Sequence, residues 1–308
     1  MRTAAIPDDD CAMSTETVVG IVGGTGLYDL PGLTEHTWVA VESPFGAPSD
    51  DVLVGRLGSQ RIAFLPRHGR GHRIPPHEIN FRANIDALKR VGATSLVSVS
   101  AVGSLRADLT PGTFVIVDQF VDRTLRGPKT FFGTGCVAHV PMAHPTCARV
   151  MAHLAAAGAE LGLPIVRGGT YVAMEGPQFS SLAESELHRS LKCDVVGMTN
   201  MPEAKLAREA ELCYATVAMV TDFDCWHPDH DHVKIEDVLR VLHANAAHAR
   251  ELVARVIPRI GADPVACPRG CDRTLDISIL TPPEARDPEL VRRLDAIAGR
   301  VLRRAHEG

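Results

Sequence analysis

Apolar residues follow two patterns along this chain. Short runs rich in Val, Ile and Ala predict β-strands, and longer segments with apolar residues at every third or fourth position predict helices. The predicted strands cover residues 17–22, 50–54, 61–65, 94–104, 114–118, 169–174, 194–198, 213–220 and 275–280. The predicted helices cover residues 81–91, 147–161, 203–211, 235–257 and 288–305. Because these strands and helices alternate without a linker or an internal repeat, we expect one α/β domain over 17–308, with a large mixed β-sheet flanked by helices.

Two segments fall outside these elements. Residues 1–16 are polar, contain Asp8, Asp9 and Asp10, and lack the basic and apolar regions of a signal peptide. We therefore expect them to form a disordered leader. Residues 123–145 form a long stretch rich in glycine and polar residues, and an irregular segment of this length inside a domain usually serves as a lid or a subunit contact.

The composition narrows the class of protein. Of the 308 residues, 45% are hydrophobic and 22% are charged, and the net charge is −5. The sequence has no basic stripe of the kind that nucleic-acid binding requires. It also has no apolar run approaching the ~18 residues of a membrane span. These features are typical of a soluble enzyme, and we expect a cytoplasmic location.

The eight cysteines are too sparse for a disulfide framework. Cys193 and Cys213 lie in apolar runs, which is typical of reduced thiols in a core. Cys267-Pro-Arg-Gly-Cys271 could form a local disulfide or half of a metal site. Because no second Cys/His pair follows at zinc-ligand spacing, the sequence favours two free thiols and predicts no metal.

Three strand ends carry groups that suit an anion. Gly23-Gly-Thr-Gly26 offers backbone N–H groups and the hydroxyl of Thr25. Residues 66–73 concentrate Arg and His side chains, with Arg67 as the expected bidentate donor. Ser100, Ala101 and Gly103 end a third strand. Since ligands of open α/β sheets bind outside the carboxyl ends of strands, we expect one shared crevice.

Asp222 and Asp224 follow the most apolar predicted strand. Carboxylates two residues apart on a strand face the same way, and their repulsion raises one pKa, which makes a proton donor near neutral pH. The alternative is a polar strand end in which Asp222 caps a turn. The hexapeptide alone leaves both interpretations open.

Six motifs together resemble the trimeric purine nucleoside phosphorylases, and within that family the methylthioadenosine branch. They are Gly23-Gly-Thr-Gly26, Pro66-Arg-His-Gly69, Ser100-Ala-Val-Gly-Ser104, Met174-Glu-Gly-Pro-Gln-Phe-Ser180, Gly197-Met-Thr-Asn-Met-Pro-Glu203 and Thr221-Asp-Phe-Asp224. The likeness extends from about residue 18 to residue 260, with a weaker match at 278–280. It implies a purine nucleoside phosphorylase-like fold and a homotrimer. It also implies no organic cofactor, with inorganic phosphate as a co-substrate.

The resemblance assigns roles to individual residues. It implies a phosphate site formed by Thr25, Arg67, His68, Ser100, the Ala101 backbone and Thr199. It also implies that Phe179 packs on the base, Ser180 helps to recognise it, Met198 lies against the ribose, and Asp222 acts as the acid beside Asp224. His68 and Asp222 are thus the expected catalytic residues.

A further group matches the pocket for a 5′-methylthio substituent. It consists of Ile235, Val238, Leu239 and Leu280, and the resemblance implies that His139 reaches in from a neighbouring subunit. These apolar residues can also be explained by ordinary helix packing. On periodicity alone, helix packing is favoured over a pocket for the 5′-methylthio group.

The resemblance implies phosphorolysis of S-methyl-5′-thioadenosine to adenine and 5-methylthioribose 1-phosphate, a purine and methionine salvage reaction. Two aspartates favour adenine, because a 6-amino group donates hydrogen bonds, whereas the 6-oxopurine relatives carry Asn at the position of Asp222. Residues 197–203 and 98–103 are more similar to the 6-oxopurine and methylthioinosine branches, so these substrates are the alternative. A non-catalytic purine-binding or phosphate-binding domain is a second alternative, which Arg67, His68 and Asp222 argue against.

Overall fold

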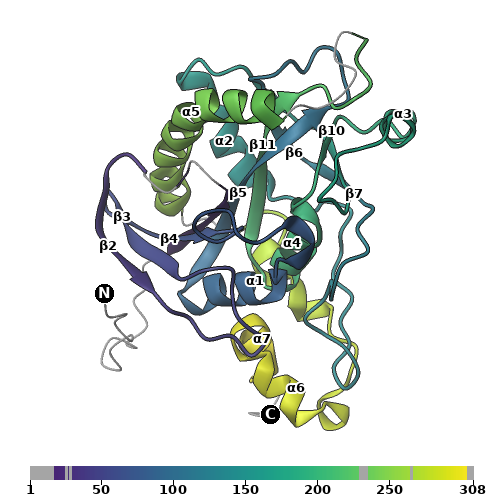
Figure 1. Cartoon of the computed structure of the whole chain (residues 1–308). Helices are drawn as coiled ribbons and strands as arrows, with labels where there is room; N and C mark the ends of the chain where they lie inside the picture. The colour runs from purple at the N-terminus through teal and green to yellow at the C-terminus, as the bar shows by residue number, and fades with distance from the viewer. Residues whose placement is uncertain (1–16, 25–26, 28–29, 229–234, 264–265, 304–308) are drawn as a thin grey trace.

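The protein is an α/β structure with a central β-sheet and helices on both of its faces (Figure 1). The structure, a computed structural model, describes residues 17–24, 27, 30–228, 235–263 and 266–303. The predicted leader, residues 1–16, lies outside them. The predicted single mixed sheet is confirmed, because eleven described strands form one hydrogen-bonded sheet with parallel and antiparallel pairs.

The strands branch at β5. They are β1 (Val18–Gly23), β2 (Leu33–Val39), β3 (Val52–Leu57), β4 (Gln60–Pro66), β5 (Ala93–Ser104), β6 (Phe114–Val117), β7 (Gln119–Asp122), β8 (Ile165–Arg167), β9 (Thr170–Ala173), β10 (Val195–Gly197) and β11 (Cys213–Asp222). The main order is β2-β3-β4-β1-β5-β10-β9-β7, while β11 pairs with β5 and β6, and β6 pairs with β8. Strands β1, β4, β5 and β11 run parallel, so their carboxyl ends lie at one edge.

Helices cover the two faces in separate groups. One face packs against α2 (Ala148–Glu160) and α5 (Ile235–Ala262), and the other against α1 (Phe81–Arg90), α4 (Asn200–Glu209) and α7 (Asp295–Leu302). The packing of strand β11 explains why its sequence is apolar throughout. Its residues alternate between the two cores, for example Val217 toward α2 and α5 and Ala218 toward α1 and α4. A strand covered on both sides needs apolar side chains at every position.

A capping box is present at the start of α3 (Leu182–Ser190). The hydroxyl of Ser181 accepts from the backbone N–H of Glu184 at 3.3 Å, and the Glu184 carboxylate accepts from the backbone N–H of Ser181 at 2.8 Å. These bonds satisfy N–H groups that a helix end otherwise leaves unpaired. The short 3₁₀ helices are η2 (Pro76–Glu78), η3 (Cys271–Ile277) and η4 (Pro283–Ala285).

The predicted strand at 275–280 is wrong. The first half of this segment, 275–277, belongs to η3, and in the second half Ile279 makes an isolated bridge to Ala138. The backbone N–H of Leu275 bonds to the carboxylate of Glu211 at 2.9 Å instead of to a neighbouring strand. The alternation of apolar and polar residues here therefore does not reflect a sheet.

Other differences concern shorter elements. The predicted terminal helix is divided at Leu294 into α6 (Pro288–Arg293) and α7. Strands β2, β7 and β8 were not predicted. The long irregular stretch after β7 is confirmed, because the structure assigns no helix or strand from 123 to 147. None of the helices in the described part of the chain is long and apolar enough to cross a membrane.

Candidate active site

A cavity of about 500 Å³ opens at the carboxyl ends of β1, β4, β5, β10 and β11, with the first turns of α5 closing one side. The parallel strands bring together at this edge residues that lie far apart in the sequence. The predicted site residues that line the cavity are Arg67, His68, Ser100, Ala101, Phe179, Met198, Thr199, Asp222, Asp224, Ile235, Val238 and Leu239.

Arg67 is almost fully buried, with 1% of its surface exposed, and forms an ion pair with Glu203. Nε and Nη2 of Arg67 donate to the two carboxylate oxygens of Glu203 at 2.7 and 3.1 Å. Nη1 donates to the carbonyl of Val99 at 3.0 Å. Burial acts to lower the pKa of Arg67, but the charge of Glu203 outweighs it and the pKa is raised. The guanidinium therefore stays charged and fixed, while Glu203 balances part of its charge.

A polar network fixes Glu203 in turn. Oε1 of Glu203 accepts from the hydroxyls of Ser98 at 2.7 Å and Tyr214 at 3.0 Å. The amide of Asn200 donates to both of these hydroxyls at 3.0 Å. A buried network with its members paired holds one geometry. Arg67 is thus positioned by residues of β5, α4 and β11.

His68 is neutral at neutral pH. Burial and the charge of Arg67 lower its pKa to about 4. Nδ1 lies 2.8 Å from the carbonyl of Ile74, which can only accept, so Nδ1 carries the proton and Nε2 is an acceptor. The His68 ring stacks on His72 with centroids 4.3 Å apart. His68 therefore contributes to the cavity a polar group rather than a fixed positive charge.

Of the other basic residues in the 66–73 segment, His72 lines the cavity, whereas Arg70 and Arg73 do not. Arg70 bonds to Asp50 at 2.7 Å and lies over the ring of Trp38 at 4.2 Å. Arg73 also approaches Asp50, at 3.9 Å. The predicted concentration of basic charge is therefore divided, with Arg67 and His68 at the cavity.

Hydroxyl groups at the ends of β5 and β10 complete the polar end of the cavity. Ser100 donates to the side chain of Asn200 at 3.3 Å. Oγ1 of Thr199 is buried and has no hydrogen-bond partner among the described residues. Because an unpaired buried hydroxyl is unfavourable, its position on the cavity wall favours a ligand that bonds to it.

Asp222 and Asp224 line the same cavity, next to Gly103 of β5. The Asp222 carboxylate accepts from the hydroxyl of Thr221 at 2.7 Å and from the backbone N–H of Asp224 at 2.8 Å. Asp224 is 4% exposed, and its Oδ2 has no partner of normal geometry among the described residues. Burial raises the pKa of Asp224, although nearby Ser185 and Ser180 act against this. The pair therefore contains Asp222, whose carboxyl group is fixed by two donors, and Asp224, whose buried carboxyl group holds its proton to higher pH.

Gly103 lies directly beside both aspartates. A Cβ atom at this position would be 2.9 Å from Oδ1 of Asp222 and 3.3 Å from Cβ of Asp224. We expect Gly103→Ala to displace the side chain of Asp222 and to lower kcat/KM by about tenfold or more, since small misplacements of catalytic groups have large effects. Steady-state assays measure this effect. Gly127→Ala is the matched control, because Gly127 has open space around it; equal losses in both variants would contradict the expectation.

The apolar end is formed by Phe179, Met198 and the start of α5. Ile235 and Leu239 are 51% and 43% exposed and line the cavity together with Val238. They are therefore not ordinary packing residues of α5, which is the interpretation that periodicity alone favoured. Phe179 is 45% exposed, so its ring is available to a flat ligand.

Of the predicted site residues that the structure describes, Ser180, His139 and Leu280 are not on the cavity wall. Thr25 lies outside the described residues. Ser180 lies beside the pair, since its hydroxyl acts on Asp224 and its carbonyl accepts from Cys225 at 3.4 Å. His139 and Leu280 lie together elsewhere, because the 138–279 bridge joins their segments.

The sequence did not reveal the residues that hold Arg67 in place. Glu203 was noted only as part of a motif and as a helix start, and Ser98 and Asn200 were not singled out. Their signal was available in part, since Glu203 and Asn200 belong to the motif 197–203. That Glu203 pairs with Arg67 depends on the fold.

The family of this chain follows from a comparison with known proteins. The model of the phosphorylase superfamily matches residues 18–258. The chain belongs to this superfamily and is an enzyme of the purine nucleoside phosphorylase type, so the predicted family and fold are confirmed.

Individual relatives indicate a branch within the superfamily. The S-methyl-5′-thioadenosine phosphorylase of Cereibacter sphaeroides is 58% identical over 288 residues, which cover 94% of this chain and 99% of the relative. That of Bradyrhizobium diazoefficiens is also 58% identical, over 289 residues, with coverage of 94% and 99%.

Solved structures agree with this branch. A methylthioadenosine phosphorylase from an antarctic soil metagenomic library has a TM-score of 0.86 and 44% identity, covering 92% of this chain and 99% of that one. The Schistosoma mansoni methylthioadenosine phosphorylase in complex with adenine has a TM-score of 0.74 and 39% identity, covering 80% and 93%.

Proposed function

We propose that this protein catalyses the phosphorolysis of S-methyl-5′-thioadenosine to adenine and 5-methylthioribose 1-phosphate. One observation supports this function most. A single cavity joins a polar end with Arg67, an acidic end with Asp222 and an apolar end with Leu239. A phosphate, a purine and a methylthio group match these three ends in chemistry. The relatives named above carry the same activity in their names.

The polar end holds inorganic phosphate as the nucleophile. Arg67 supplies the fixed positive charge, Ser100 and Thr199 supply hydroxyls, and the Ala101 backbone supplies an N–H group. Because Glu203 balances part of the Arg67 charge, the neutral donors carry more of the binding than the sequence suggested. Nε2 of His68 accepts a hydrogen bond from the protonated oxygen of the monoprotonated phosphate, and no proton is transferred. Thr25 is expected to add a further hydroxyl.

The reaction transfers the ribosyl group from nitrogen to phosphate. A phosphate oxygen attacks C1′ from below the sugar while the bond between C1′ and N9 breaks, and the electron pair of that bond moves into the purine. The transition state resembles a ribosyl cation, which the phosphate stabilises electrostatically. Phosphate is a co-substrate, and no cofactor or covalent enzyme intermediate takes part.

The acidic end stabilises the departing adenine. Asp222 delivers a proton to N7, so that adenine leaves as a neutral molecule, and solvent later restores the proton. Asp224 accepts from the 6-amino group with the help of Ser180. A site that bonds an exocyclic group discriminates against an analogue by ~10⁴ or more, because the mismatch leaves buried groups unpaired. This arrangement favours adenine over 6-oxopurines.

The apolar end of the cavity explains why the site would prefer a 5′-methylthio substituent. Ile235, Val238 and Leu239 offer apolar surface, and Met198 lines the same cavity. Since a methylthio group gains by leaving water, these side chains favour it over a 5′-hydroxyl.

A homotrimer completes the site. His139 and Leu280 lie on two segments that a bridge joins, away from the cavity of their own chain. Leu280 is 63% exposed. A neighbouring subunit would bring both together to the apolar end. The cytoplasmic location remains a prediction from the composition.

A direct assay tests the function. Purified protein is incubated with phosphate and with methylthioadenosine, adenosine, methylthioinosine or inosine, and release of the base is followed. We expect the highest kcat/KM for methylthioadenosine and no release without phosphate. A higher kcat/KM for inosine or methylthioinosine would reject this substrate. Nucleoside binding without phosphate-dependent release of base would indicate a non-catalytic domain.

A further inference from the structure

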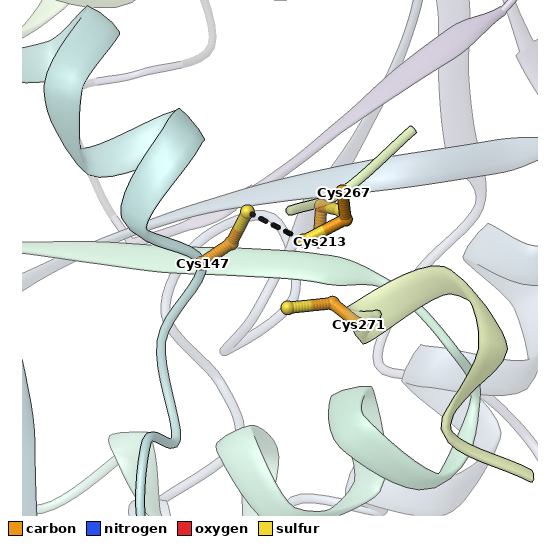
Figure 2. A group of neighbouring side chains, drawn as sticks. All are labelled: Cys147, Cys213, Cys267 and Cys271. Carbon is orange, nitrogen blue, oxygen red and sulfur yellow. Dashed lines mark hydrogen bonds between the residues drawn. The ribbon is translucent and has the colours of Figure 1, made fainter. Parts of the chain in front are cut away.

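Four buried cysteines converge at the end of the sheet where β11 begins (Figure 2). Cys147 precedes α2, Cys213 is the first residue of β11, Cys267 follows α5, and Cys271 starts η3. Their sulfur atoms all lie within 4.8 Å of one another. The sequence predicted no metal because Cys267 and Cys271 lacked a second pair at close spacing; the fold supplies that pair from distant segments.

The spacing of the sulfurs fits one tetrahedral ion. Cys147 Sγ and Cys267 Sγ are 3.7 Å apart. A disulfide requires ~2.0 Å. Four thiolates at ~2.3 Å from a zinc ion form a tetrahedron whose edge is ~3.8 Å. Iron–sulfur clusters contain several metal atoms and hold their cysteines farther apart than 4.8 Å, so the group is too compact for one.

The backbone holds the cysteines in place. The backbone N–H of Cys147 donates to the carbonyl of Tyr214 at 2.7 Å, which ties α2 to β11 beside Cys213. Gly270 has φ 64°, and its N–H donates to the carbonyl of Cys267 at 2.8 Å. This tight turn directs Cys267 and Cys271 to the same point, and glycine adopts such a φ without strain.

The surroundings balance the charge of a thiolate site. Four thiolates and one divalent cation carry a net charge of about −2. Arg149 interacts electrostatically with Cys147 and Cys213, and Arg208 with Cys271. Cys147 also occupies the N-terminus of α2, where the helix dipole favours negative charge. Cations and dipoles of this kind tune and orient metal ligands.

We propose that Cys147, Cys213, Cys267 and Cys271 bind one zinc ion as a structural tetrathiolate site. Four protein ligands fill a tetrahedral coordination sphere and leave no position for substrate. The site is also remote from the cavity, because β11 runs from Cys213 to Asp222, a length of roughly 30 Å at the usual rise of a strand. Zinc binding releases the thiol protons and involves no oxidation or reduction.

The ion would join three elements that are separate in the sequence. It links the start of α2, the start of β11 and the segment that follows α5. Helix α5 lines the cavity with its first turns and is anchored near its end by Cys267. The zinc therefore stabilises the layer that covers the cavity without contacting substrate.

Metal analysis of the whole protein tests this site. The chain is purified without a histidine tag, and its metal content is measured by inductively coupled plasma mass spectrometry. We expect about one zinc per chain, and loss of most of it together with a lower Tm in Cys271→Ser. Cys193→Ser is the matched control, because Cys193 is buried but lies outside the cluster, and it should keep its zinc.

A second measurement uses the unmodified protein in case Cys271→Ser does not fold. An organomercurial thiol reagent should release zinc, recorded with a zinc-sensitive dye, and cobalt substitution should give a thiolate-to-metal charge-transfer band. Zinc-free protein with four titratable thiols at the cluster would overturn the site. A disulfide between any two of these cysteines in the mass spectrum would overturn it, as would iron in place of zinc.

Discussion

Replacing Asp222 with asparagine is expected to lower kcat for methylthioadenosine by ~10² to 10⁴-fold, the usual contribution of a positioned general acid. Asparagine keeps the shape and can still accept from the backbone N–H of Asp224, now 2.8 Å from Oδ1. The hydroxyl of Thr221 retains the carbonyl of Val102 at 3.2 Å as a partner. The substitution therefore removes the acid with little effect on the fold.

The binding of phosphate should change little in this variant, because Asp222 lies at the base end of the cavity. Steady-state kinetics with both substrates varied separates the effects on kcat and on each KM. A loss confined to KM for the nucleoside, with kcat unchanged, would mean that Asp222 only positions the substrate. The amide of asparagine can donate a hydrogen bond to a 6-oxo group, so the ratio of activities should shift toward methylthioinosine.

Comparing Asp224→Asn with Asp222→Asn shows which of the two carboxyl groups supplies the catalytic proton. Burial raises the pKa of Asp224, so its carboxyl remains protonated to higher pH than an ordinary one. An acid catalyst with this property loses activity as the pH rises through its pKa. If Asp224 supplied the proton, the alkaline decline of kcat would disappear in Asp224→Asn and persist in Asp222→Asn. We expect the reverse.

The sequence predicts those residues of the candidate site that lie at or near the carboxyl ends of strands. Ser100 and Asp222 end strands that the apolar pattern identifies, and parallel strands place their carboxyl ends at one edge. The pattern fails at 275–280, because alternation of apolar and polar residues occurs also where a side chain such as that of Glu211 replaces the neighbouring strand. Local periodicity carries no information about such a distant partner.

Distance along the chain also explains why the sequence did not reveal the residues that hold the site residues in place. Glu203 lies 136 residues from Arg67, and Cys213 lies 54 residues before Cys267. Neither pair has a local spacing that marks it. The motifs name the groups that face the ligand, whereas the residues that hold those groups become evident only from the contacts in the fold.

The buried ion pair between Arg67 and Glu203 gives the largest expected change in stability. Glu203 is 2% exposed, so Glu203→Gln leaves the Arg67 charge in the interior without its counterion. Removing one partner of a buried pair typically costs about 3 to 5 kcal/mol. We expect a loss of this size in the free energy of unfolding, measured by urea denaturation, together with a higher KM for phosphate because the guanidinium is no longer held.

Two further variants separate stability from phosphate binding. Glu160→Gln removes a carboxylate from the exposed pair with Arg259 and should change the free energy of unfolding far less than Glu203→Gln does. The double variant Arg67→Met with Glu203→Leu removes both buried charges, so most of the lost stability should return, although the hydroxyls of Ser98 and Tyr214 lose their acceptor. Its KM for phosphate should nevertheless remain high. A double variant with normal phosphate KM would show that Arg67 serves only the fold, and equal losses in Glu203→Gln and Glu160→Gln would contradict the buried pair.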